Sequence, residues 1–543
     1  MDNYFVSSCK RVKDWICRQF GQKEKKTVHH KKFADGGEVI VWETGRAGEE
    51  AASYENLFLR KEIAGFRTNI RREQSCSIKS LTRDYLYKQL LSSGEYTFDH
   101  MLVIKDPYGE APLTALALFF LEEPACVRVT TKGNLKETDF VTELPKKKEH
   151  RVPILGMYAE KANDIVIEIL DDEGNCVKSH TFTIRTKRLP KSLRNVITVK
   201  KWTDKPAYSN IMINGGVKIH TCVFDIEGEI RYYLSRKPRG YGIFPLSDGH
   251  FFYMEKYISV PSYSNPQTVE SYDMDYFGRV FRTYLTEKGV HHTAEEKAGG
   301  NILTGSNSML EHTEDCVIEI DRQTGEIVWQ LNMAEIFDET YQDMMDWCHV
   351  NSAAYYEKDR TILISLRNVH AVICVDYDTK KLRWILSDPK FWEGTKMTPY
   401  LLQPEGDVKW CYQQHAAFEI ALPDESNPQK KRIIVYDNHW AKRRKAKSFD
   451  KDPLSYVSFY DIDEEKKTVS LHKRFAGPKT RIRANGIYVP DKKRVYNMAG
   501  SYAEPVDGDG GGIFEYDYET GEVLSEFGVK PGFFRAYPFE PNV

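Results

Sequence analysis

Three short segments of this chain place histidines where apolar, β-type runs begin. The segments are His291-His-Thr-Ala-Glu, Asp346-Trp-Cys-His-Val-Asn-Ser and Gln413-Gln-His-Ala-Ala. The middle segment also carries Asn351, and Arg367 follows its histidine by eighteen residues. Imidazole, carboxamide and guanidinium groups can together hold an oxyanion, and a neutral imidazole can act as a nucleophile. The segments therefore predict a site for an anionic group, provided that the fold brings them together.

A repeated hairpin after Pro190 supplies the elements that would position these side chains. In each copy a strand ends near an acidic residue, a turn follows, and a second strand begins. Six copies recur at a spacing of roughly 50 residues, with one longer gap. They are Val223–Tyr233, Tyr272–Phe281, Ile318–Trp329, Val375–Trp384, Tyr460–Val469 and Phe514–Val523. This period is typical of a β-propeller, so we predict an all-β protein with a six-bladed propeller.

The register of the histidines relative to these hairpins predicts that they converge. His292 and His349 lie 29 and 27 residues before the aspartate of the following hairpin. His415 lies farther from its own hairpin, by a surplus that fits an insertion at residues 442–453. Counting back two strands places each histidine at the start of an innermost strand, and these strands line the channel of a propeller. Arg367 ends the next strand and points back to the same area.

Each histidine also has a simpler interpretation, because a single histidine in a β-protein is usually a satisfied core or surface residue. The matched register of three favours a site. His291 competes with His292 as the residue that lines it, since neighbours in a strand face opposite sides. Asn351 is two residues beyond His349 and is expected on the same side as that histidine.

Other polar residues near these segments are weaker candidates. Cys348 and Cys411 invite a thiol-nucleophile interpretation, but Cys348 is expected on the face opposite its neighbouring histidine. In the last repeat, Arg481, Arg483 and Asn485 are candidates to reach the site.

Composition and charge exclude several functional classes. The formal net charge of −2 over 543 residues provides no field for nucleic acid. The 10 cysteines include no Cys-x-x-Cys pair, which argues against a zinc module or disulfide scaffold and favours free thiols. There is no apolar run long enough for a signal peptide or a membrane helix. We therefore expect a cytoplasmic protein with no membrane partner.

The length and the change of pattern along the chain predict three regions. Residues 1–80 form an N-terminal extension, partly helical or irregular, with a strand at 38–42. Residues 81–192 form a small β-sandwich, and residues 193–543 the propeller. The strands expected in the sandwich are 96–100, 115–121, 125–129, 165–170 and 180–184, with a hairpin turn at 171–175.

Taken together, the motifs resemble the bacterial arylsulfate sulfotransferase family, whose members do not use a nucleotide sulfate donor. The likeness covers roughly residues 85–530, and it implies a small β-sandwich before a six-bladed propeller, with no cofactor and no metal. The segments that carry it are His291–Glu295, Gly300–Leu303, Asp346–Ser352, Ile364–Asn368, Arg383–Pro389, Gln414–Ala417 and Tyr436–Asn438.

By that resemblance, His415 matches the family's nucleophile, which carries the sulfuryl group transiently as sulfohistidine. His292, His349 and Arg367 match residues that hold and neutralise the sulfuryl oxygens, and Asn351 matches a further contact. The implied reaction is a ping-pong transfer from an aryl sulfate ester to a phenol. Either His292 or His349 would then shuttle the proton, and the sequence does not decide between them.

Two other functions are compatible with the same residues. A metal-dependent propeller lyase or hydrolase would use His292, His349 and His415 as ligands of a divalent ion. A propeller can also bind protein or glycan without catalysis. For the transferase we expect small-molecule partners, the aryl sulfate and the phenol, and no nucleic acid; a homodimer is left open.

Overall fold

The computed structural model describes most of the chain from residue 76 onward and two short stretches before it. The described residues are 28–33, 37–45, 76–203, 205–216, 219–236, 241–258, 267–308, 312–422, 427–440 and 452–540. Most of the predicted N-terminal extension and most of the insertion expected at 442–453 lie outside them. Within these ranges, no helix has both the length and the apolar character needed to cross a membrane.

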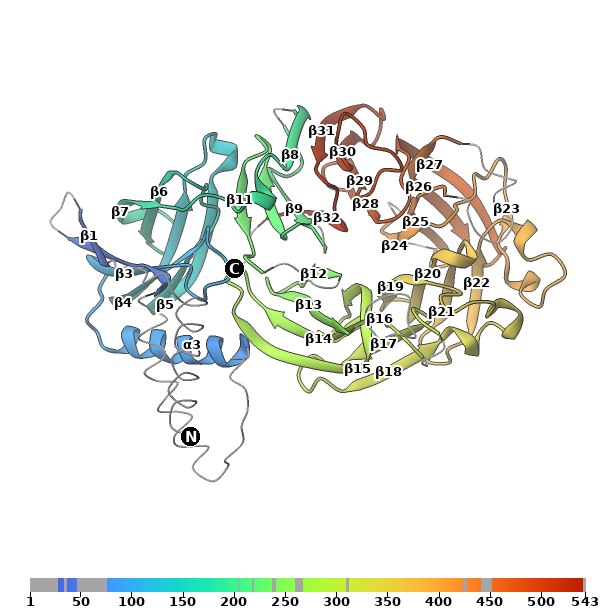
Figure 1. The fold of residues 1–543 in the computed structure, drawn as a ribbon, viewed down its shortest axis with the longest axis horizontal. Coiled ribbons are helices and arrows are strands. Elements are labelled where there is room, and N and C mark those ends of the chain that lie inside the picture. The colour runs from blue at the N-terminus through green and yellow to red at the C-terminus, as the bar shows by residue number, and fades with distance from the viewer. Residues whose placement is uncertain are drawn as a thin grey trace, which may run out of the picture.

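The N-terminal part of the described chain is a seven-stranded sheet, with helix α3 (Cys76–Ser92) packed against β4 and β5 (Figure 1). The strands pair in the order β1-β2-β3-β4-β6-β7, and β5 pairs with β4. Their bounds are β1 Val28–Lys32, β2 Glu38–Trp42, β3 His100–Lys105, β4 Ala115–Thr131, β5 Phe140–Ile154, β6 Ala162–Leu170 and β7 Cys176–Arg185.

Strand β4 runs through the middle of this sheet. It is one strand of 17 residues where two, at 115–121 and 125–129, were expected. Its first half pairs with β3 and its second half with β6, while β5 follows both halves. The strand expected at 96–100 begins instead at His100. The hairpin predicted around 171–175 is confirmed, because β6 and β7 pair across that turn.

The predicted extension contributes to the same sheet. The strand expected at 38–42 is β2, which pairs in parallel with β3. Helix α3, which the sequence pattern did not indicate, crosses residue 80. The division of the chain at residues 80 and 192 stays a prediction.

The rest of the described chain forms five sheets arranged around a common centre in a propeller-like way (Figure 1). One sheet has the order β11-β10-β9-β32, and the next is the seven-stranded β12 to β18 in sequence order. Three more follow: β19-β20-β21-β22, β23-β27-β26-β25-β24 and β28-β29-β30-β31-β8. The bounds of the first strands are β8 Ile197–Lys201, β9 Asn210–Asn214, β10 Cys222–Asp225, β11 Ile230–Tyr233, β12 Gly242–Pro245, β13 Phe251–Ile258, β14 Gln267–Met274, β15 Val280–Glu296, β16 Ile302–Ser306, β17 Cys316–Ile320 and β18 Ile327–Asn332.

All six predicted hairpins are present as antiparallel pairs. The last of them lie among the strands β19 Val350–Tyr356, β20 Thr361–Leu366, β21 Ala371–Asp376, β22 Leu382–Leu386, β23 Gln403–Pro404, β24 His415–Ile420, β25 Lys430–Asp437, β26 Leu454–Asp463, β27 Thr468–Pro478, β28 Ala484–Val489, β29 Arg494–Ala499, β30 Gly511–Asp517, β31 Val523–Val529 and β32 Arg535–Pro538. The innermost strands β15, β19, β24, β28 and β32 contact one another in succession.

The prediction that the histidines start innermost strands is confirmed for His349 and His415. Strand β19 begins directly after His349, and β24 begins at His415. His292 lies inside the long strand β15, at the point where its pairing passes from β14 to β16. The pairing with β16 shifts register between His291 and Ala294, so the backbone bulges at His292.

Two pairings between distant parts of the chain close the ring. Strand β8 pairs with the outer strand β31 of the last sheet. Strand β32 pairs with β9 and becomes the inner strand of the first sheet. Strand β32 therefore lines the centre together with the strands that carry the histidines.

Candidate active site

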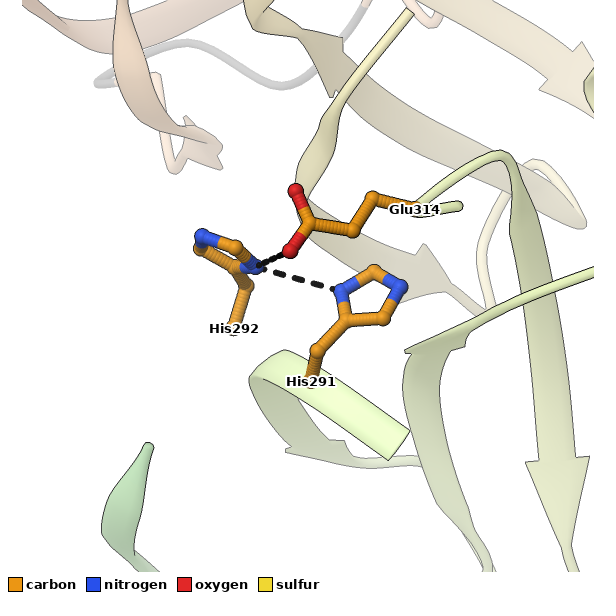
Figure 2. A group of neighbouring side chains, drawn as sticks. All are labelled: His291, His292 and Glu314. Atoms are coloured by element: carbon orange, nitrogen blue, oxygen red, sulfur yellow. Dashed lines mark hydrogen bonds and ion pairs between the residues drawn. The ribbon is translucent and has the colours of Figure 1, made fainter. Parts of the chain in front are cut away.

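His291 and His292 converge on the carboxylate of Glu314, as Figure 2 shows. Their Nδ1 atoms are 3.2 Å apart, and His292 Nδ1 lies 3.6 Å from Glu314 Oε1. His291 Nε2 donates to the carbonyl of Ser306 at 2.8 Å, so its Nδ1 accepts the hydrogen of His292 Nδ1. The expectation that the two histidines face opposite sides is wrong, because the bulge in β15 turns both inward.

Left-handed backbone conformations gather at these residues. His292, Glu314 and His349 have φ of 59°, 58° and 57°, and Arg483, directly before β28, has 64°. Non-glycine residues rarely adopt this conformation, and it persists where the surrounding structure fixes it. At these positions the side chains therefore do not alternate between the two faces of a strand, and the polar groups can turn toward the centre.

His349 is held between two carboxylates. Its Nδ1 lies 3.0 Å from both oxygens of Asp346 and 2.5 Å from Glu314 Oε2. Burial alone would lower the pKa of His349, but the charges of Asp346 and Glu314 outweigh it and raise the pKa to about 9. The same contacts hold the pKa of buried Glu314 well below its usual range, against the effect of burial. His349 is therefore an imidazolium at neutral pH.

His292 stays neutral beside it. The ring centroids of His292 and His349 are 4.7 Å apart. Burial lowers the pKa of His292 well below its ordinary value; Glu314 opposes this shift, and the positive charge of His349 adds to it. The pair thus carries one positive charge.

His415 has an amide as its partner. Its Nδ1 lies 2.6 Å from Oδ1 of Asn438, whose Nδ2 donates to Thr480 Oγ1 at 2.8 Å. This arrangement places the hydrogen of His415 on Nδ1 and leaves a lone pair on Nε2. The backbone N–H of Arg483 lies 3.4 Å from that Nε2, which is consistent with an acceptor there.

Positive charges surround His415. Burial lowers its pKa well below the ordinary value, and the nearby charges of Arg367, His349 and Arg535 lower it further, while the hydrogen bond that His415 donates to Asn438 opposes the shift only in part. Arg367 lies in the short turn η5 (Arg367–Val369), where its backbone N–H donates to the carbonyl of His349 at 3.1 Å. His415 is thus a neutral imidazole in an electropositive, buried setting.

Asn351 acts on the segment that carries His415. Its Nδ2 donates to the carbonyl of Gln414 at 2.8 Å, and its own carbonyl accepts from Arg535 at 2.7 Å. Asn351 thereby ties β19 to the start of β24 and to β32. A direct contact between Asn351 and substrate stays a prediction.

The three candidates of the last repeat differ in position. Arg483 borders the site through its backbone, and burial lowers the pKa of its guanidinium, with Tyr241 opposing. Arg481 turns outward and bonds Glu504 at 2.9 Å. Asn485 is buried and bonds the backbone of Ala536, so it holds β28 to β32.

The cysteines are unsuited to act as nucleophiles. Burial raises the pKa of Cys348 well above its ordinary value, and nearby carboxylates raise it further. Burial likewise raises the pKa of Cys411. A thiol kept protonated at neutral pH is a poor nucleophile.

Two overlapping groups of the described residues have ligand atoms close enough to hold a metal ion. They are His291, His292 and Glu314, and Glu314, Asp346 and His349. Neither contains His415, so the ligand set His292, His349 and His415 does not assemble as expected. The hydrogen bonds and ion pairs of these atoms also form one connected proton network.

Four residues of the site were missed as functional by reasoning from the sequence: Glu314, Tyr241, Asp346 and Arg535. Tyr241 Oη donates to Glu314 Oε1 at 2.8 Å, and its ring lies 4.3 Å from that of His292. Glu314 and Tyr241 precede their strands in polar loops and carry no periodic signal. Asp346 stood in the quoted motif at three residues before His349, a spacing that could have indicated a partner.

Comparisons with known proteins agree with this geometry. The profile of the Arylsulfotransferase (ASST) family matches residues 195–535, and that of the Arylsulfotransferase Ig-like domain matches residues 102–187. The second match identifies the N-terminal sheet as an Ig-like domain. The first spans the propeller-like sheets that carry every histidine of the site.

Two curated proteins are similar over most of their length. The arylsulfate sulfotransferase AssT of Lelliottia amnigena is 22% identical over 563 residues, which covers 79% of this chain and 90% of that protein. AssT of Escherichia coli O6:H1 strain CFT073 is 23% identical over 566 residues, with the same coverage. A solved structure of a protein of unknown function from Bacteroides caccae aligns with a TM-score of 0.39 at 11% identity, covering 61% of this chain and 98% of that one.

Proposed function

Because this chain belongs to the arylsulfotransferase family, we propose that it moves a sulfuryl group from an aryl sulfate ester to a phenol through a sulfohistidine on His415. The observation that carries the mechanism is the bond from His415 Nδ1–H to Asn438, which leaves the Nε2 lone pair available. The cations around His415 favour an anionic sulfuryl group next to it.

In the first half-reaction, His415 Nε2 attacks the sulfur of the ester. The N–S bond forms, the bond between sulfur and the aryl oxygen breaks, and its electron pair leaves with the phenolate. The phenolate takes the proton of His349, which becomes neutral. His349 Nδ1 is occupied by Asp346 and Glu314, so the transferable proton is the one on Nε2. Arg367 and the His349 cation neutralise the sulfuryl oxygens.

Asn438 keeps the intermediate reactive. An amide accepts the Nδ1 hydrogen but does not take it away, so sulfohistidine retains that proton. The group that leaves in the second half-reaction is then neutral imidazole and not the far more basic imidazolate. A carboxylate in this position would draw the proton and stabilise the intermediate.

The second half-reaction reverses the first with another phenol. Its oxygen attacks sulfur while the neutral His349 takes its proton, the N–S bond breaks, and the electron pair returns to His415 Nε2. Donor and acceptor belong to the same chemical class, so the group that protonates one phenolate deprotonates the other phenol. This assigns the shuttle to His349, and His292 remains its neutral neighbour.

We also infer six blades. The seven-stranded sheet divides at β15 into the four-stranded units β12–β15 and β15–β18, and four other sheets complete the ring. The cytoplasmic localisation and the homodimer stay predictions.

The test is mass spectrometry of the protein after brief exposure to 4-nitrophenyl sulfate without an acceptor. We expect a labile sulfuryl adduct on the peptide that contains His415, together with a burst of nitrophenol. Addition of phenol should discharge the adduct and produce phenyl sulfate. Steady nitrophenol release with no adduct on that peptide, or free sulfate as the only product, contradicts the proposal.

A further inference from the structure

Glu314 joins the two neighbouring sheets that carry His292 and His349. It lies in the loop before β17, while His292 is on β15 and His349 precedes β19. Its Oε1 accepts from Tyr241 and lies 3.6 Å from His292 Nδ1, and its Oε2 lies 2.5 Å from His349 Nδ1. A single buried carboxylate thus touches a phenol and two imidazoles that differ in protonation.

The backbone of Glu314 also holds the residue that follows His349. Its carbonyl accepts the N–H of Val350 at 2.7 Å, and its own N–H donates to Asn307 Oδ1 at 2.7 Å. Its φ of 58° is one that only a well-fixed neighbourhood maintains for glutamate. The carboxylate position is therefore set by the same segment that fixes the start of β19.

We propose that Glu314 is a positioning residue for proton transfer: its carboxylate fixes the imidazolium of His349 with Nε2–H available to the aryl oxygen. This inference rests on the proposed sulfuryl transfer. Asp346 contacts Nδ1 of His349 from the same segment of the chain, whereas Glu314 contacts it from the neighbouring sheet. The two contacts orient the ring, and each carboxylate favours its charged form.

The charged and titratable groups that face Glu314 come from three elements. His291 and His292 approach from β15, His349 with Asp346 from the segment before β19, and Tyr241 from the segment before β12. The pKa of the Tyr241 phenol is raised well above its ordinary value, by burial first and by Glu314 next, so it remains a donor. Glu314 is thus the anion that these donors share.

The experiment measures how strongly the rate depends on the basicity of the leaving phenol. The transfer rates of the wild-type protein and of Glu314→Gln are measured with a series of donors from 4-nitrophenyl sulfate to 4-methylphenyl sulfate. The acceptor is the same throughout. A nitrophenolate leaves readily without a proton, whereas a methylphenolate needs one. General acid catalysis contributes about 10²- to 10⁴-fold, so we expect a loss of about 100-fold or more for the basic phenol and about tenfold or less for nitrophenol.

Glu319→Gln is the matched control. Glu319 is buried on β17 in the same sheet and bonds Lys297 and Asn301, away from the histidines. It should leave the dependence on leaving-group basicity unchanged. Glu314→Asp, which keeps the charge and shortens the side chain, should restore much of the rate for basic phenols, and it provides the same measurement if the glutamine variant does not fold.

The outcomes separate the two proposals. If the wild-type protein transfers no sulfuryl group from any donor, the proposed function fails before Glu314 is tested. If the wild-type protein is active and Glu314→Gln slows every donor by the same factor, the transferase stands and the positioning role is wrong. The positioning role is also wrong if the rate of Glu314→Asp depends as steeply on leaving-group basicity as the rate of Glu314→Gln.

Discussion

His349 and His415 occupy the same place in adjacent sheets and have opposite chemistry. Each stands at the start of an innermost strand, and each has Nδ1 bonded to an oxygen. For His349 the oxygens belong to two carboxylates, and its pKa is raised to about 9. For His415 the oxygen belongs to an amide, and burial with nearby cations lowers the pKa well below the ordinary value. The repeat sets where a histidine stands, and its neighbours decide what it does.

The largest effect is expected from removing the amide-bonded histidine. His415→Ala should lower the rate of nitrophenol release by about 10⁴-fold or more, because no other group can accept the sulfuryl group. Initial rates with 4-nitrophenyl sulfate and phenol measure the loss. His472→Ala, in the outer part of the same sheet, should retain the wild-type rate. A comparable loss in both variants would point to a general folding defect.

Asn438→Asp tests the comparison by giving His415 the kind of partner that His349 has. A carboxylate should raise the pKa of free His415, and in sulfohistidine it should draw the Nδ1 proton, so that the leaving group gains imidazolate character. We expect about 10- to 100-fold slower turnover at neutral pH, with an adduct that accumulates because it discharges slowly. Stopped-flow measurement of both half-reactions checks this. Faster discharge in the variant would show that the amide does not have the role assigned to it.

The pH dependence should report both histidines. The raised pKa of His349 means that its acid form is present below about pH 9 and is lost as the pH rises through that value. The lowered pKa of His415 means that its neutral form persists until well below pH 6.5. With a basic leaving phenol, kcat/KM should therefore be flat through neutrality and fall on the alkaline side near pH 9. A fall on the acidic side close to pH 6.5 would contradict the assignment of His415.

Tyr241→Phe should have the smallest effect, because it removes one donor to Glu314 and keeps the ring against His292. The loss in rate should be about tenfold, which corresponds to the lower end, about 1.5 kcal/mol, of what a hydrogen bond to a charged group contributes. It should be greater for basic than for acidic leaving phenols. Equal losses of rate for all donors would show that Tyr241 contributes through packing alone.

The sequence was sufficient to predict the hairpin repeat and the convergence of His292, His349 and His415. These features depend on local spacing, which survives wherever strands alternate with turns of similar length. The prediction that His291 faces away from His292 was wrong, because a bulge and a left-handed residue interrupt the alternation of side chains between the two faces of the strand. No local pattern marks a carboxylate that a loop such as that of Glu314 brings from one sheet to the next. Arg535 is more distant still, at 184 residues from the carbonyl that it bonds.

The pairing of β32 with β9 also has a consequence for the order of events during synthesis. A ribosome that has made residues 1–530 has produced every histidine of the site, yet it has made neither Arg535 nor the strand that closes the first sheet. Earlier sheets can form as they emerge, but the electropositive setting of His415 is completed last. A nascent or prematurely ended chain would therefore contain the nucleophile His415 without the positive charge of Arg535 near it. In this sense, activity reports that synthesis has passed β32.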